Sequence, residues 1–169
     1  VEPIYAEINS DNLDLENCTY CEFRNYIHAM AFLELGEYDK VIALLQEIIE
    51  ISDRLTLKKA LIAAHIKKEE YEIVDEVISD FESKMELENW LDLCLYSGTR
   101  LLIEKKDSLA KPYLNRILEK SIPEDHKFLL AQAHYYSEDY KESEILLEEL
   151  VLKNPKNIEY NVLLAISYQ

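Results

Sequence analysis

A short segment recurs along the chain at an interval of about 34 residues. It reads Glu-Tyr-Asp at 37–39, Glu-Tyr-Glu at 70–72 and Asp-Tyr-Lys at 139–141. The first two tyrosines are 33 residues apart, and the next is 69 residues further on, which is two intervals. A weaker copy lies between them, with Asp107 in place of the tyrosine. A repeat of this length is typical of arrays of small structural units, so it constrains the fold more than any other feature.

Each copy is followed by apolar residues at helical spacing. Val41, Leu45 and Ile48 are separated by four and three positions, which places them on one face of an α-helix. The chain has only 2 glycines and 4 prolines, which disfavours a β-fold rich in tight turns. We therefore predict an all-α fold, with helices near 17–35, 38–51, 55–67, 71–84, 88–104, 108–120, 124–136, 140–153 and 157–169.

A small residue lies at the centre of most helices that precede a copy. Ala29, Gly98 and Ala131 occupy this position, Ala165 follows the last copy, and Ile62 stands there in the second. A small side chain lets a neighbouring helix approach closely, and stacked helix pairs bury a core that one pair cannot bury alone. We expect Gly98 and Ala131 to be such close-packing positions.

This pattern resembles the tetratricopeptide repeat family, whose unit is a helix–turn–helix of roughly 34 residues. The best copy matches the unit at Leu130, Ala131, His134, Ser143, Leu147 and Pro155, and a partial last copy matches it at Leu164, Ala165 and Tyr168. The resemblance covers about residues 22–169 and implies a superhelical solenoid of antiparallel helix pairs over 17–169. Residues 1–16 match poorly, and we interpret them as an N-terminal extension or cap. Because the chain starts without Met and stops inside a predicted helix, we expect it to be part of a longer protein.

The net charge of −16 bears on the partners. Nucleic acids and anionic membrane surfaces would be repelled, because both require clustered Lys and Arg. No apolar run reaches about 18 residues, so we predict no transmembrane helix. Three cysteines, Cys18, Cys21 and Cys94, are a small odd number that fits a reducing compartment. These features favour a cytoplasmic protein.

No constellation of residues points to catalysis. Two isolated glycines exclude the common phosphate-binding loops. Cys18, Cys21 and His28 could offer three metal ligands, but a structural zinc site needs four, so we interpret the cysteines as helical residues. His65 and His134 occupy large-residue positions of their repeats and are interpreted as packing groups. We predict no enzyme activity, no catalytic residue, no metal and no cofactor.

The resemblance implies that the first helix of each pair lines a concave groove. The repeat register places Tyr26, Met30, Leu33, Lys59, Leu95, Leu102, Phe128, Gln132 and Tyr135 on it, followed by Val162 and Ile166. We expect these positions to be dispensable for the core, because they lie one turn from the small residues. The tetratricopeptide domains that hold acidic chaperone C-termini carry Lys and Asn where this chain has Tyr26 and Met30, so that ligand class is not expected.

An apolar and aromatic groove favours a protein–protein interaction module. As an adaptor or scaffold, it would bind an apolar helix or peptide of a partner, with a basic flank drawn to the surrounding acids. One alternative is a peptide-sensing regulatory domain of a larger bacterial regulator. Another is that the groove is filled by further repeats of the same protein or by self-association, as a homodimer or an assembly scaffold.

Overall fold

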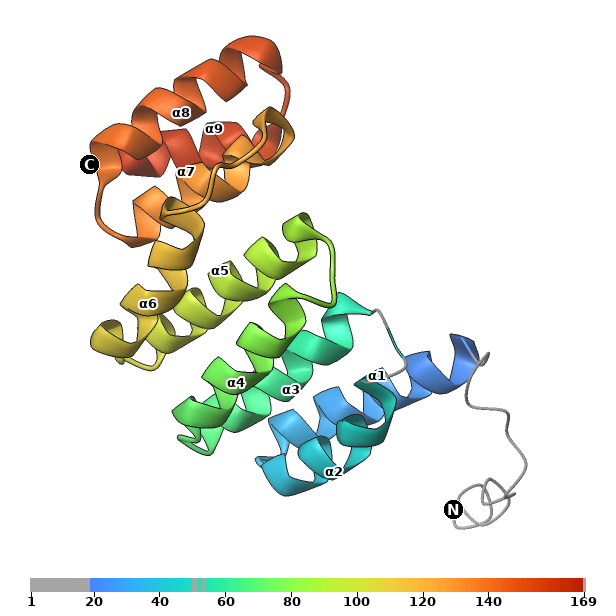
Figure 1. Ribbon diagram of the computed structural model, residues 1–169. Helices are drawn as coiled ribbons and strands as arrows, with labels where there is room; N and C mark the ends of the chain where they lie inside the picture. Colours follow the sequence, from blue (N-terminus) through green and yellow to red (C-terminus); the bar gives the residue numbers. More distant parts are fainter. Residues whose placement is uncertain (1–18, 50–51, 53, 169) are drawn as a thin grey trace. The chain divides into compact units, whose positions relative to one another are not determined.

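The computed structural model describes residues 19–49, 52 and 54–168, and over these residues the chain is all-α, with no strand. Its helices are α1 (Thr19–Glu34), α2 (Tyr38–Ile49), α3 (Leu55–Lys67), α4 (Tyr71–Glu82), α5 (Leu87–Ile103), α6 (Asp107–Leu118), α7 (Lys127–Tyr136), α8 (Tyr140–Lys153) and α9 (Ile158–Ser167) (Figure 1). Each predicted helix is present with bounds within a few residues of those expected from the periodicity. In the part of the chain described here, no helix is both long and apolar enough to cross a membrane.

The largest difference in helix bounds lies before α7. The sequence predicts a helix from residue 124, but Glu124–His126 form a 3-10 turn, η2, and α7 begins at Lys127. Pro123 precedes this turn in an extended conformation, with φ −58° and ψ 155°. The ψ value is far from helical, so the chain enters α7 through a tighter turn than the apolar spacing suggests.

The chain divides into two compact units, residues 1–61 and 62–169, and the division falls inside α3. We call these the N-terminal unit and the C-terminal unit. The extension predicted for residues 1–16 lies outside the described residues. A single continuous array over 17–169 stays a prediction.

In the N-terminal unit, α1 packs against α2. Ala29 of α1 and Val41 and Leu45 of α2 are fully buried. The small residue predicted at the centre of the first helix is therefore a core residue, as is the start of the apolar face predicted for the second. Ile48 is only half-buried, and the adjacent Ile49 is buried instead.

In the C-terminal unit, α5 packs with α6 and α7 with α8, while α4, α6 and α9 contact the helices next to them in the chain. The apolar faces predicted for the second helices are confirmed, because their members are all buried: Val74, Ile78, Phe81, Ala110, Leu114, Ile117, Ser143, Leu147 and Leu150. Two polar groups tie neighbouring helices together. Trp90 Nε1 donates a hydrogen bond to the Ile78 carbonyl (3.0 Å), and Ser143 Oγ donates one to the Ala131 carbonyl (2.9 Å).

The small residue Gly98 sits at a close helix contact, as predicted. A Cβ atom added there would lie 2.8 Å from Leu114 Cδ2 and 3.0 Å from Leu114 Cγ, which is closer than atoms normally approach. Ala131 is fully buried, as expected for the equivalent position of the next pair. Ala165, the last residue of this series, is exposed.

Four helix ends share one turn geometry. Gly36, Glu69, Lys105 and Glu138 follow α1, α3, α5 and α7 with φ between 59° and 73°, and they are 33, 36 and 33 residues apart. In the first turn, Glu37 N–H donates to the Phe32 carbonyl (2.9 Å) and Gly36 N–H to the Leu33 carbonyl (3.1 Å). The other three turns repeat both bonds, which together form a Schellman motif. The sequence repeat is therefore also a repeat of backbone geometry.

Candidate binding surfaces

The predicted groove residues are divided between the two units. In the N-terminal unit, Tyr26, Met30 and Leu33 lie on α1 and Lys59 lies on α3, and all four are half-buried. Each therefore combines packing within its unit with some exposed surface. Lys59 takes part in further interactions, so it is not an unpaired cation.

In the C-terminal unit, the predicted groove residues lie on α5 and α7, which contact each other. Leu95 is buried, so it offers almost no surface to a partner. Leu102, Phe128, Gln132 and Tyr135 are half-buried. The structure therefore brings the α5 and α7 members onto neighbouring helices.

Phe128 and Tyr135 contribute to the core, contrary to the expectation that the core does not need them. Both pack against a buried cluster of Ala131, Leu147, Leu150 and Leu163. The Phe128 ring also lies 4.8 Å from the Tyr160 ring of α9, centre to centre. A residue one helical turn from Ala131 can therefore still be part of the core, because α8 and α9 both contact α7.

Helix α9 carries a row of exposed apolar side chains. Ile158, Val162 and Ile166 are spaced four residues apart and are 77%, 55% and 39% exposed, so they lie along one face of the helix. The opposite side holds the buried residues Leu163 and Ser167. Val162 and Ile166 were expected from the register, whereas Ile158 was missed, although the four-residue spacing would have found it. We call these three residues the α9 stripe.

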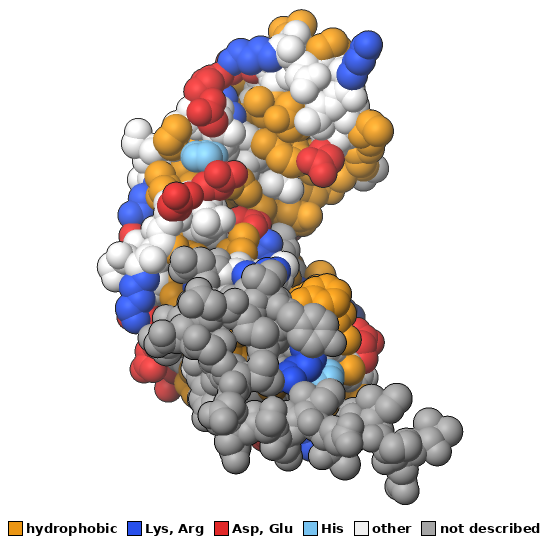
Figure 2. Space-filling model, turned by 90° about the vertical axis from the view of Figure 1, so that its right-hand side faces the viewer, with side chains coloured by type: hydrophobic (Ala, Val, Ile, Leu, Met, Phe, Trp, Pro, Cys, Tyr) orange, Lys and Arg blue, Asp and Glu red, His pale blue; other side chains and the backbone are white. Residues whose placement is uncertain are grey.

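Figure 2 shows hydrophobic side chains gathered at the top of the view, at the height of α7, α8 and α9 in Figure 1. Helix α9 also contacts α7, which carries the exposed Tyr136 and the half-buried Gln132.

A cavity of about 620 Å³ lies between α4 and α6, the second helices of neighbouring pairs. Its walls are apolar at Leu109 and Pro112, and aromatic at Tyr71 and Tyr113. Burial raises the pKa of Tyr113 to about 12, so its hydroxyl stays protonated at neutral pH. The repeat pattern does not predict this cavity, because its walls come from the second helices and not from the first helices that line the expected groove.

The cavity has an acidic rim. Glu72, Asp75 and Glu76 of α4 are exposed and line it, together with Arg116 of α6. Arg116 Nη2 binds Asp75 Oδ1 at 2.6 Å. Glu72, Asp75 and Glu76 stand at positions i, i+3 and i+4, a spacing that places the three acids on one side of the helix.

His65 and His134, which the sequence predicts as packing groups, are buried and half-buried. His65 is buried, with Nδ1 2.8 Å from Glu70 Oε2, and His134 Nδ1 lies 3.0 Å from Asp139 Oδ2. Hydrogen bonds from Lys68 and then His65 lower the pKa of the Glu70 carboxyl. The two His–carboxylate pairs occupy the same place in two of the four turns.

Among the described residues, neither the cysteine nor the possible metal ligands form a reactive centre. Burial raises the pKa of the Cys94 thiol to about 12, which makes it a poor nucleophile. Cys18 and the Cys21 side chain lie outside the described part of the chain. Within that part, no three His, Cys, Asp or Glu side chains come together as metal ligands.

The chain matches no protein-family model, no curated protein and no solved structure. Its function has to be inferred from its own surfaces.

Proposed function

We propose that this chain is a tetratricopeptide-type interaction module that binds an apolar helix or extended segment of a partner protein in the cytoplasm. The observation that carries the proposal is the α9 stripe, three exposed apolar side chains on one face of a helix. Contiguous exposed apolar surface is uncommon on a soluble domain and marks sites of association.

The chemistry of the surface defines the partner. An amphipathic helix buries apolar residues at i, i+3, i+4 and i+7 against such a face. The chain carries a net charge of −16, so basic residues flanking the apolar segment would add a long-range attraction. Gln132 of α7, a helix that contacts α9, also retains exposed surface.

The repeat character of the chain is supported by the four equivalent turns. Gly36, Glu69, Lys105 and Glu138 recur at spacings near the length of a tetratricopeptide unit, and each ends the first helix of a pair. In repeat arrays, the exposed residues of the first helices supply the binding surface. This agrees with a partner site on α7 and α9.

A set of amphipathic helical peptides with one apolar face tests the proposal. We expect a peptide with flanking lysines to bind more tightly than a neutral one, and a peptide with flanking glutamates to bind most weakly. Val162→Ser with Ile166→Ser should weaken binding by about tenfold, the typical result of removing apolar interface anchors. Raising the salt concentration should reduce the advantage of the lysine flanks and leave the apolar contribution unchanged.

The matched control is Ile145→Ser. Ile145 is 45% exposed, similar to Ile166, but lies on α8, a second helix. It should leave peptide binding unchanged. Equal loss in both variants, measured by titration calorimetry, would show that the peptides respond to general surface hydrophobicity and not to the α9 stripe.

Self-association is the second candidate, because the α9 stripe could equally face a second copy of the chain. Light scattering over a range of concentrations separates the two. A concentration-dependent dimer that Val162→Ser with Ile166→Ser abolishes would favour self-association. A monomer that binds the lysine-flanked peptide would favour the interaction module.

A further inference from the structure

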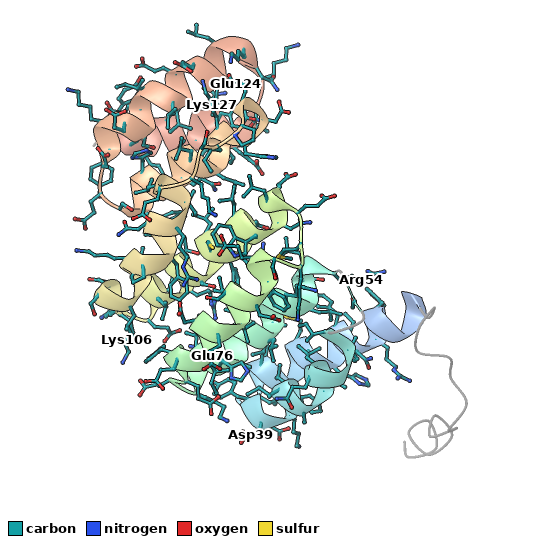
Figure 3. All side chains as sticks on the ribbon, in the orientation of Figure 1. Asp39, Arg54, Glu76, Lys106, Glu124 and Lys127 are labelled. Atoms are coloured by element: carbon teal, nitrogen blue, oxygen red, sulfur yellow. The ribbon has the colours of Figure 1, made fainter. Side chains whose placement is uncertain are left out.

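The cavity between α4 and α6 combines apolar walls with unneutralised negative charge. Leu109, Pro112 and the rings of Tyr71 and Tyr113 form the walls, and Glu72 and Glu76 lie at the rim. Glu76, labelled in Figure 3, is on α4. It lies one helical turn beyond Glu72. We call this feature the α4–α6 pocket.

The cations nearest the pocket are already paired with other carboxylates. Arg116 is held by Asp75 (2.6 Å), and Lys106 Nζ lies 3.1 Å from Glu69 Oε1. Glu72 and Glu76 form no ion pair with any residue in the described part of the chain. Two negative charges therefore remain beside the apolar walls.

The aromatic walls already attract cations from the chain itself. The Arg116 guanidinium lies 5.4 Å from the centre of the Tyr113 ring, and Lys106 Nζ lies 5.8 Å from the centre of the Tyr71 ring. A ring face attracts cations within about 6 Å, and arginine most often. The pocket is thus an environment in which a positive charge is favoured.

We propose that the α4–α6 pocket binds an arginine side chain of a partner peptide. The aliphatic part of the side chain would lie against Leu109 and Pro112, and the guanidinium would bind the carboxylates of Glu72 and Glu76. Arginine fits better than lysine because its planar group binds carboxylates through paired donors and stacks on aromatic rings. The site goes beyond the proposed function, since it uses other helices than the α9 stripe and recognises charge.

The test uses the full chain and a fluorescently labelled, acetylated and amidated peptide with one central arginine between two leucines. A second peptide carries citrulline, the neutral analogue of arginine, and a third carries lysine. We expect saturable one-to-one binding of the arginine peptide in fluorescence anisotropy. The citrulline peptide should bind at least about fivefold more weakly, and lysine should be intermediate.

Variants locate the site. Glu72→Gln with Glu76→Gln should weaken binding of the arginine peptide by at least about fivefold. Glu142→Gln with Glu144→Gln on α8 removes the same charge elsewhere, and should change binding by less than about twofold. Tyr71→Leu should weaken binding and Tyr71→Phe should preserve it, because the ring and not the hydroxyl contacts the cation.

Several results would overturn the proposal. Equal weakening by the α4 and α8 double variants would mean that the peptide senses only net charge. Equal binding of the citrulline or lysine peptide would remove the arginine specificity. Loss of binding in Val162→Ser with Ile166→Ser, with none in the α4 variant, would place the peptide on the α9 stripe. The last result distinguishes failure of this proposal from failure of the proposed function.

Discussion

In the α5–α6 pair, apolar side chains from both helices are buried, whereas on α9 an apolar row stays exposed. Leu101 and Leu114 are almost fully buried around Gly98, while Ile158 and Val162 project from α9 with more than half of their surface exposed. Both regions have helical apolar spacing. Helical spacing therefore defines an apolar face, and the presence of a packed neighbouring helix decides whether that face is buried or exposed.

Gly98→Leu should give the largest effect. Even a Cβ atom would lie 2.8 Å from Leu114 Cδ2, so a leucine must push α5 and α6 apart. We expect a loss of about 3 kcal/mol in the free energy of unfolding, the upper part of the usual range for overpacking. Urea denaturation followed by circular dichroism measures it.

Ala165→Leu is the matched control, because Ala165 holds the same repeat position on α9 but is exposed. We expect a change within about 0.5 kcal/mol. If both variants lost the same stability, the distinction between a close-packed pair and an open α9 face would be wrong.

Phe128→Ala tests how much a half-buried residue of the predicted groove contributes to stability. Phe128 is half-buried and packs against the Tyr160 ring and against the buried cluster of Ala131, Leu147, Leu150 and Leu163. We expect a loss of about 1–2 kcal/mol, below the cost of truncating a fully buried phenylalanine. Leu152→Ala on the exposed side of α8 should be nearly neutral. Peptide binding by the Phe128 variant should be measured at a temperature where the variant stays folded. Otherwise, loss of binding through unfolding could not be told from loss of a direct contact with the peptide.

The sequence predicted the second helices best. The apolar residues of α4 recur at Val74, Ile78 and Phe81, and all are buried, because a helix with one neighbour-facing side follows the simple amphipathic pattern. First helices pack on more than one side: α5 buries Trp90, Leu91 and Leu93 together. One-face periodicity therefore could not separate groove from core: Leu95 is buried, and Phe128 and Tyr135 are half-buried and pack against the core.

The α4–α6 pocket could not be predicted for a different reason. Its walls come from two second helices whose facing residues, such as Glu76 and Pro112, are 36 positions apart. No local pattern joins such residues. The repeat interval does relate equivalent positions of α4 and α6, so it could have predicted a pocket between them if second helices were expected to form binding surfaces.

The turns test whether the close-packed α5–α6 pair and the neighbouring α7–α8 pair carry the same backbone strain. Lys105 ends α5 and Glu138 ends α7, with φ of 59° and 65°. A non-glycine residue in this conformation is strained, and Gly36 shows the unstrained solution. Lys105→Gly and Glu138→Gly should each stabilise the chain by about 0.5 kcal/mol, because relief of strain exceeds the added entropy of the unfolded chain. Gly36→Ala should destabilise it, and thermal melting compares the three.

Equal gains at Lys105 and Glu138 would show that the α5–α6 and α7–α8 pairs share the same backbone strain and differ only in side-chain packing. A loss at either site would mean that the removed side chain contributes more than its backbone strain costs.

The smallest expected effect concerns the α3–α4 turn. Glu70 binds Lys68 Nζ at 2.6 Å and His65 Nδ1 at 2.8 Å, and Lys68 followed by His65 lowers the pKa of its carboxyl. A lowered pKa means that the folded state favours the ionised form, so the stabilisation is present above the carboxyl pKa of the unfolded chain and disappears as pH falls through the folded value. Glu70→Gln should therefore cost less than about 0.5 kcal/mol at pH 7, and the difference from wild type should vanish in acid. Glu72→Gln, on α4 and without an ion pair to the described residues, is the control and should leave stability nearly unchanged at pH 7. A constant difference between wild type and Glu70→Gln from pH 7 to acid, in melts recorded by circular dichroism, would assign the effect to the shape of the amide instead of the charge. In that case the His65–Glu70 contact would act through packing, as the core contacts of α5 and α6 do.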